Sequence, residues 1–315
     1  MSYLTAHWSF DPFAVVVMIL VAWHEVGLAR LASRSRADRT SQRRRRSLYF
    51  YSGLALLLLA VASPLDYWSD RYFFVHMIQH LLLMFGAPVL VVAGAPWQPL
   101  LAGLPGHLGK DATRQVMTGG WARPLRAAAG FLLRPWPAVI AFNLVMVIWH
   151  LPGPYDLGTT NQAVHIWLMH GTFFAAGLLF WLQFLPSPPF RIRMSRAGQA
   201  AALVATNVQM WFLAMALSLF STGPWYAVYN HVPGVSLPQL PDQQIGAAIL
   251  WVCGDFWAIP TLIYVVRRML AEEGDVGRAV DKILGRGARR QGWGRPPARP
   301  GPAGHGAIGP GTDGA

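Results

Sequence analysis

The sequence predicts an all-α membrane protein, built as a bundle of about seven transmembrane helices. Three observations lead to this fold class. Of the 315 residues, 54% are apolar and only 13% are charged, which is too little charge to cover a soluble protein of this length. The apolar residues come in blocks of about twenty, the length that a helix needs to cross a hydrocarbon core of about 30 Å. The basic residues fall almost entirely between alternate blocks.

The apolar blocks define the predicted spans in chain order. They cover residues 12–31, 48–65, 72–93, 137–151, 163–185, 200–221 and 245–268. The fourth block is short, because it reaches the sequence Trp-His-Leu-Pro at residues 149–152 and the proline stops the helix. The segment between the third and fourth blocks, residues 95–135, mixes apolar and basic residues and can hold an interfacial helix.

Lys and Arg predict the orientation of these spans. All 26 basic residues except Arg71 lie on one side of the membrane in this arrangement. They occupy the segments 30–46, 110–134 and 191–196 and the chain from residue 267 onward. The basic side is the cytoplasmic side. We therefore expect the N-terminus outside the cytoplasm, the C-terminus inside it, and a multi-pass protein of the bacterial plasma membrane.

The composition also predicts domains and partners. Residues 1–270 are expected to form the transmembrane domain, and residues 271–315, rich in Gly, Pro and Arg, a largely disordered cytoplasmic tail. Membrane topology explains the net charge of +12 better than a nucleic-acid groove does. The expected partners therefore include membrane lipids and exclude nucleic acid. The tail either binds anionic lipid or is solvated and enforces the topology.

The sequence contains no signature of a soluble enzyme. It has no phosphate-binding glycine loop, no G-x-S-x-G and no H-E-x-x-H. Its single cysteine, Cys253, excludes an intrachain disulfide and a C-x-x-C metal motif. We therefore do not expect an enzyme.

Histidines concentrate near the outer ends of the predicted spans. Six of the ten lie there: His76, His80, His150, His165, His170 and His231. A polar side chain within a bilayer is costly unless it is paired, so such residues are candidates for function. The i, i+4 spacing of His76 and His80 places both imidazoles on one face of a helix, where they can hold one metal ion. His150 ends the fourth span at the same level, and His165 and His170 lie in the first two turns of the fifth.

The spacing of the later histidines and the nearby methionines refine this site. His165 and His170 are five residues apart, about 140° around an α-helix, so we expect that they do not share one ion directly. One is then a ligand and the other a supporting or packing residue. Met77, with Met84 and Met169 as further options, makes copper the favoured metal, because thioether beside imidazole suits Cu(I).

Asp242 begins the last span beside the histidines and has two interpretations. Asp is a good N-cap and suits the helix dipole. Alternatively, its carboxylate binds the ion or orients a histidine. The histidines also have a second interpretation, because a solitary histidine in a span usually makes an interhelical hydrogen bond and methionines there usually pack. Several histidines at one depth favour a metal or haem site, whose candidate ligands are His76, His80, His150, His165, His170, Asp242 and Met77.

Other polar residues within the spans are weaker signals. His24 and Glu25 in the first span form either a self-satisfied pair or a proton-handling group. Asp255 in the seventh span must be paired or protonated. Hydrogen bonds between helices are expected for Asn143, Asn207 and Gln209.

Four segments in the same order resemble one known family. Residues 74–84 read F-V-H-M-I-Q-H-L-L-L-M and are followed by Gly-Ala-Pro at 86–88 and again at 94–96. This stretch resembles the CtaG family of cytochrome c oxidase assembly factors. Three further segments are similar to the same family, namely residues 149–156, 164–181 and 242–251. The resemblance covers about residues 50–268.

The resemblance implies a role in assembling a haem–copper terminal oxidase. It implies that a subunit of that oxidase is the partner, and that copper enters the catalytic subunit from the outer side of the membrane. Two other functions stay open on the residues alone. One is a haem-bearing redox protein with histidines as axial ligands. The other is a metal or solute transporter with Asp255, Glu25 and His24 as a relay.

Overall fold

The computed structural model describes residues 7–8, 12–33, 35–104, 114–230 and 232–273. These residues are mainly helical and contain no β-strand, which confirms the predicted all-α class. Residues 1–268 form one compact unit, and the description below concerns that unit. The predicted tail lies almost wholly outside the described residues, so its disorder and the predicted domain boundary stay predictions.

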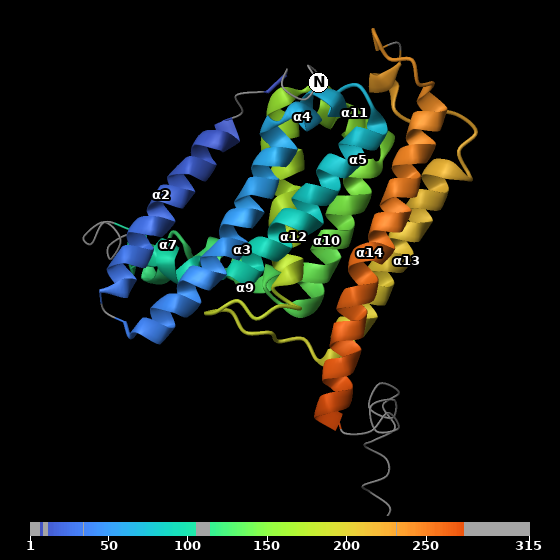
Figure 1. The fold of residues 1–315 in the computed structure, drawn as a ribbon. Coiled ribbons are helices and arrows are strands. Elements are labelled where there is room, and N and C mark those ends of the chain that lie inside the picture. The colour runs from blue at the N-terminus through green and yellow to red at the C-terminus, as the bar shows by residue number, and fades with distance from the viewer. Residues whose placement is uncertain (1–6, 9–11, 34, 105–113, 231, 274–315) are drawn as a thin grey trace, which may run out of the picture. The chain divides into compact units, whose positions relative to one another are not determined.

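Figure 1 shows the helices in chain order, coloured from the N-terminus to the C-terminus. The N-terminal half contains α2 (Pro12–Ala32), α3 (Ala37–Ala62), α4 (Pro64–Ser69), α5 (Phe73–Leu81), η1 (Leu82–Gly86), α6 (Ala87–Gly94), α7 (Trp97–Gly103) and α9 (Arg123–Leu132). The C-terminal half contains α10 (Pro135–His150), α11 (Pro152–Thr160), η2 (Val164–His170), α12 (Gly171–Trp181), α13 (Arg196–Ser218), η3 (Ala227–Tyr229) and α14 (Gln239–Glu273).

Six helical segments of the described chain are long and apolar enough to cross a membrane. A seventh is obtained if α9 and α10, which meet at a bend of 85°, count as one span. The predicted number of about seven is therefore confirmed. The second helix differs from the prediction, because α3 begins at Ala37 rather than at residue 48. Arginine is a good helix former, so the basic run continues the helix instead of ending it.

The described part of the predicted interfacial segment includes helices α7 and α9. Helix α7 packs on α2, and Arg30 Nη1 donates to the carbonyl oxygens of Ala102 and Gly103 at 3.0 and 3.1 Å, at the C-terminus of α7. Helix α9 turns sharply away from α10 and contains no buried residue. Exposed Leu125 and Phe131 share it with arginines, as expected for a helix that lies along a membrane surface.

In the described residues, two π-helical turns interrupt the helices. The first, η1, precedes Pro88, which has no N–H to donate and whose ring would clash with the carbonyl of Met84 in a regular α-helix. The second, η2, begins the helix that continues as α12. Such turns are rare in proteins, and those that occur often lie at functional sites.

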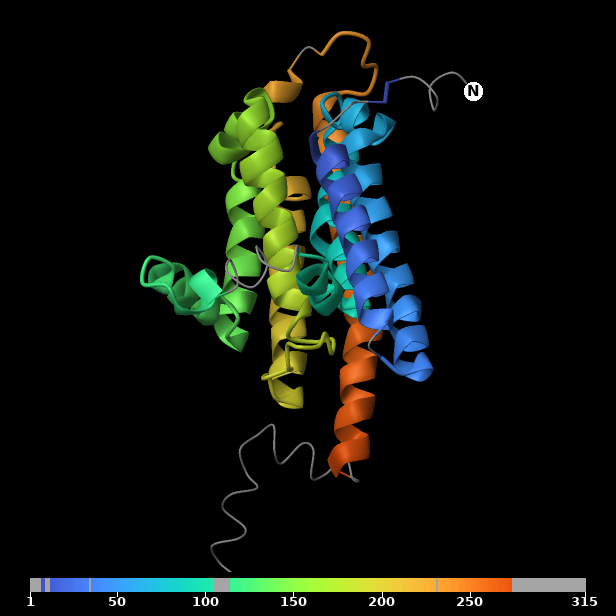
Figure 2. The same cartoon turned by 90° about the vertical axis from the view of Figure 1, so that its left-hand side faces the viewer.

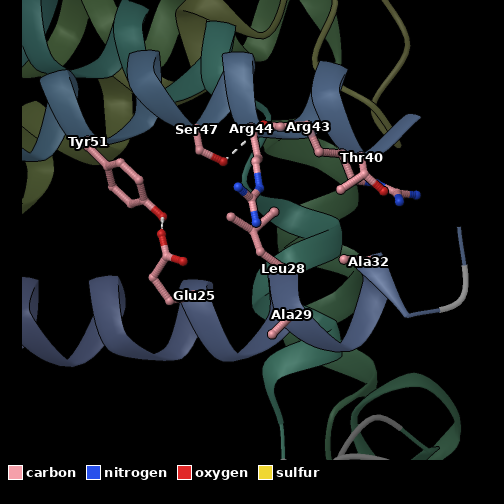
Figure 3. Close-up of a pocket in the computed structure, with 9 residues that line it drawn as sticks. All are labelled: Glu25, Leu28, Ala29, Ala32, Thr40, Arg43, Arg44, Ser47 and Tyr51. Atoms are coloured by element: carbon pink, nitrogen blue, oxygen red, sulfur yellow. Dashed lines mark hydrogen bonds between the residues drawn. The ribbon is translucent and has the colours of Figure 1, made fainter. Parts of the chain in front are cut away.

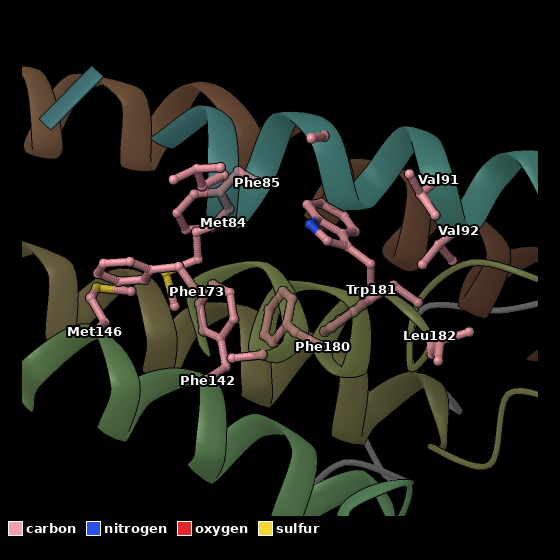
Figure 4. Packing of buried hydrophobic residues seen from close by; sticks show 14 of the residues in the cluster. Met84, Phe85, Val91, Val92, Phe142, Met146, Phe173, Phe180, Trp181 and Leu182 are labelled. Carbon is pink, nitrogen blue, oxygen red and sulfur yellow. The ribbon is translucent and has the colours of Figure 1, made fainter. Parts of the chain in front are cut away.

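The apolar core lies between α5–α6, α10 and α12. Figure 4 shows Met84 and Phe85 facing Phe173 and Phe180 of α12, with Phe142 of α10 beside them. The rings of Phe142 and Phe180 stack with centroids 4.2 Å apart.

A glycine allows the helices of this core to approach closely. A Cβ atom at Gly177 would lie 2.4 Å from the carbonyl oxygen of Met84 and 2.7 Å from Cγ of Pro88. Small residues at such contacts are typical of helix packing in membranes.

One end of the bundle carries the short helices α4, α11 and η3, and we call it the histidine end (Figures 1 and 2). Helices α5 and η2 begin there and α10 ends there. The basic connection between α2 and α3 lies at the opposite end of these helices. The orientation of the bundle in a membrane stays a prediction.

Candidate metal centre

Five imidazoles from three helical segments converge at the histidine end. His76 and His80 come from α5, His150 from the last residue of α10, and His165 and His170 from η2. Each ring is buried, with at most 7% of the residue exposed. The ring centroid of His76 lies 4.2 Å from that of His80 and 5.2 Å from that of His165. The sequence predicted these five as candidate ligands, and the structure brings all of them together.

Three of the five can hold one metal ion. His76, His165 and His170 each offer a ring nitrogen, and these nitrogens all lie within 4.8 Å of one another. Metal–nitrogen bonds of about 2.0 Å place two nitrogens of a tetrahedral ion about 3.3 Å apart. The nitrogens therefore lie within about 1.5 Å of the separation that such an ion requires.

The prediction that the five-residue spacing separates His165 from His170 is wrong. Their ring centroids lie 4.3 Å apart, because residues 164–170 form a π-helical turn. Hydrogen bonds in such a turn join residues five apart, so positions i and i+5 come to one face of the helix. The estimate of 140° assumed a regular α-helix.

Tyr229 sets the tautomer of His76. Its hydroxyl donates to the carbonyl oxygen of Ser69 at 2.9 Å and lies 2.8 Å from the hydroxyl of Tyr155 and 3.1 Å from Nδ1 of His76. A phenol has one hydrogen to donate, so Tyr155 and His76 Nδ1 must both donate to it. His76 Nε2 then carries a lone pair. Supporting bonds of this kind usually orient metal-binding histidines.

The two tyrosines keep their hydrogens at neutral pH. Burial raises the pKa of Tyr155 and of Tyr229 well above the ordinary value of 10.0. The network around His76 is therefore made of neutral phenols.

His80 and His150 each keep one ring nitrogen with a free lone pair. His76 Nε2 lies 2.7 Å from Nε2 of His80, which must donate because the His76 nitrogen accepts. This leaves Nδ1 of His80 as an acceptor. His150 Nδ1 donates to the carbonyl oxygen of Met146 at 2.6 Å, which leaves its Nε2 as an acceptor.

Several of these nitrogens have no hydrogen-bond partner. Among the described residues, none is found for His80 Nδ1, His150 Nε2, His165 Nε2 or either ring nitrogen of His170. Buried polar atoms are normally hydrogen-bonded, so a group of unpartnered nitrogens in one place is unusual. Unpartnered imidazole nitrogens that lie close together can serve as metal ligands.

Asp242 and Met77, the other predicted ligands, lie differently. Both oxygens of Asp242 accept backbone hydrogen bonds, from Phe73 N–H at 2.8 Å and Phe74 N–H at 3.0 Å. Asp242 therefore caps α5, the helix that carries His76, from the start of α14. Met77 packs with Phe73 in a separate apolar cluster. A ligand role for either residue stays a prediction, and His231 lies outside the described residues.

The structure also reveals residues that the sequence did not single out. A loop at the histidine end is tied over the site by Tyr226, whose hydroxyl donates to the carbonyl oxygen of His150 at 2.9 Å, and by Tyr229. Asp156 accepts backbone hydrogen bonds from the same loop. The aromatic residues at 225–229 were the available signal, because buried tyrosines usually have polar partners.

The other polar residues of the spans lie away from the cluster. His24 Nδ1 and Glu25 both bond the hydroxyl of Tyr51 rather than each other. Asp255 is paired, as predicted, and accepts from Asn207 and Trp211. Hydrogen bonds between helices are confirmed for Asn143, Asn207 and Gln209.

Comparison with known proteins gives a family match across the membrane domain. Residues 14–272 match the model of the family described as cytochrome c oxidase caa3 assembly factor (Caa3_CtaG). Uncharacterized proteins of Mycobacterium bovis and Mycobacterium tuberculosis are each 24% identical over 288 residues, which is 87% of this chain. The chain spans only 41% of the length of each of these relatives. No solved structure matches.

The family match includes the helices that carry all five converging histidines. It agrees with the all-α membrane fold and with the four segments quoted above. The chain therefore belongs to the Caa3_CtaG family of cytochrome c oxidase assembly factors.

Proposed function

We propose that this chain holds a copper ion in the five-histidine cluster and passes it to the catalytic subunit of a haem–copper oxidase. The observation that carries the proposal is the convergence of buried, unpartnered imidazole nitrogens from α5, α10 and η2. Imidazole suits copper, zinc, nickel and iron. Copper is the choice among them because the oxidase that the family assembles requires copper.

The ligand set suits an ion that must leave again. The described cluster contains imidazoles and no carboxylate or thiolate, because Asp242 is bonded to backbone N–H groups. Neutral ligands add no charge attraction to the bonds that hold the ion. With three nitrogens within 4.8 Å, a tetrahedral ion keeps a position for an incoming ligand from the partner subunit.

The charge distribution supports delivery from the outer side. The cluster lies at the histidine end, whereas the arginines at the start of α3 lie at the other end of the bundle. Basic connections face the cytoplasm. Copper would accordingly enter and leave from the outer side of the plasma membrane, through binding and ligand exchange rather than an enzymatic reaction.

Metal analysis of the purified full chain tests the proposal. Cells grown with copper should yield wild-type protein with bound copper, and a His165→Ala/His170→Ala variant should lose it. His24→Ala is the matched control, since His24 is also buried in a span but bonds Tyr51 outside the cluster. Wild-type protein without copper would refute the proposal. Intense visible haem bands would instead favour the redox alternative.

The cellular role needs a separate measurement. Deletion of the gene should lower oxidase activity, and added copper should restore part of it. Complementation by the His24→Ala variant but not by the double variant would connect the cluster to assembly. If the double variant complements fully, the cluster is not needed for delivery.

A further inference from the structure

A hollow between α2 and α3 lies apart from the histidine cluster (Figure 3). It has a volume of about 310 Å³. It is lined by Glu25, Leu28, Ala29, Ala32, Thr40, Arg43, Arg44, Ser47 and Tyr51. A second hollow of about 690 Å³ shares Ala32, Thr40 and Arg44 with the first, so Arg44 stands between the two.

One end of the hollow is closed by a completed hydrogen-bond group. The hydroxyl of Tyr51 donates to Glu25 and lies 2.8 Å from Nδ1 of His24. The Glu25 carboxylate, the one acidic group that lines the hollow, is therefore already engaged.

The other end contains cations with unused donors. Arg43 Nη1 donates to Ser35 Oγ at 2.8 Å, while the hydroxyl of Ser47 donates to a backbone carbonyl at 2.9 Å. Figure 3 shows the guanidinium of Arg44 extending from α3 toward Leu28 of α2. It makes no hydrogen bond or ion pair with any described residue. An anion is the ligand that this end lacks, and guanidinium groups bind phosphate well.

The hollow lies at the boundary between a basic and an apolar surface. Helix α3 is basic up to Arg46, and beyond the buried Ser47 the large side chains of Leu48 and Tyr49 are exposed. On α2, exposed Met18 and Ile19 continue the apolar surface toward the other end of the helix. Arginines at such a boundary lie at the level of lipid headgroups in a membrane.

We propose that this hollow binds the phosphate of an anionic phospholipid, with Arg43 and Arg44 as its donors. The acyl chains then lie along the exposed apolar faces of α2 and α3. In a phospholipid the anionic headgroup is followed by the acyl chains, which matches the basic hollow followed by the apolar surface. Inorganic phosphate has no acyl chains to bury on the exposed apolar faces. Its only favourable contacts would be with Arg43 and Arg44, opposed by repulsion from the Glu25 carboxylate.

Lipid binding to the full chain in detergent tests the site. Native mass spectrometry and thermal unfolding would be compared for phosphatidylglycerol, phosphatidylcholine and inorganic phosphate. The test variant is Arg43→Gln/Arg44→Gln. The control is Arg39→Gln/Arg46→Gln, which removes the same charge from the same helix at residues that line neither hollow.

If the hollow binds the phosphate specifically, the test variant should lose about tenfold more affinity for phosphatidylglycerol than the control does. Tenfold corresponds to about 1.4 kcal/mol, the scale of one charge-assisted hydrogen bond. Equal losses of affinity in the two variants would show that the lipid responds only to the overall positive charge of α3, and would overturn the proposal. Equal stabilisation by phosphatidylcholine or by inorganic phosphate would also overturn it. Unfolding of each variant without lipid checks that both are folded.

Discussion

Replacing Asp242 by alanine tests whether this residue caps α5 or binds metal. The carboxylate accepts two backbone hydrogen bonds in the first turn of α5, at 2.8 and 3.0 Å, and the residue is 2% exposed. The side chain of Tyr72, the N-cap residue, makes no capping hydrogen bond. Nothing else in the described chain replaces the lost acceptor.

The expected magnitude follows from these two bonds. Hydrogen bonds to charged groups contribute about 1.5–3 kcal/mol each, and the loss of a cap typically costs about 1 kcal/mol. We expect Asp242→Ala to lower the free energy of unfolding by about 2–4 kcal/mol. Asp242→Asn keeps one acceptor oxygen without the charge, so its loss should be about half as large.

Denaturant unfolding in detergent micelles, followed by tryptophan fluorescence, measures this difference. The matched control is Asp156→Ala, which removes the same side chain from two longer bonds of 3.3 Å. It should cost less than about 1 kcal/mol. Copper bound per folded molecule should stay unchanged in Asp242→Ala. Equal destabilisation by both substitutions, or loss of copper from a stable Asp242→Ala protein, would refute the capping role.

Three further predictions address packing, metal affinity and pH. Gly177→Ala should destabilise the protein by about 1–3 kcal/mol because its Cβ would clash with a carbonyl oxygen, whereas Gly171→Ala on the same helix, with open space, should be neutral or stabilising; unfolding titrations of both variants measure this. Tyr229→Phe removes the acceptor of His76 Nδ1 and should weaken copper binding about 10- to 100-fold in a competition assay, with little loss if the tyrosine is only a packing residue. Burial raises the pKa of Tyr155 and Tyr229 above 10.0, so at high pH the folded chain keeps protons that the unfolded chain loses. The free energy of unfolding should therefore keep the full contribution of these tyrosines below pH 10.0 and fall above it. An unfolding free energy that stays constant above pH 10.0 would contradict the buried phenol network.

The spans and the histidine cluster were predictable for the same physical reason. A bilayer requires long apolar helices, and it makes each buried imidazole conspicuous. The i, i+4 spacing of His76 and His80 gave their common face directly. His150 joined them because a proline two residues later ends its helix at that level.

The details that escaped prediction depend on contacts distant in the sequence. The π-helical turn at 164–170 replaces one set of backbone hydrogen bonds by another, and local composition does not distinguish the two. One of the two interpretations of Asp242 made it the cap of its own helix, yet it caps α5, where Phe73 lies 169 residues earlier. Tyr229 reaches His76 across 153 residues.

The wide turn at the start of the fifth span also sets the alignment of everything that follows it. Because of this turn, the side chains of α12 point in different directions around the helix axis from those they would have after an uninterrupted α-helix. Gly177 meets the carbonyl of Met84, and Phe180 stacks on Phe142, only with that rotation in place. The inserted residue that aligns His165 with His170 thus also determines which surface of α12 enters the core. A chain shortened by one residue there could keep the core contacts or the paired imidazoles, but not both.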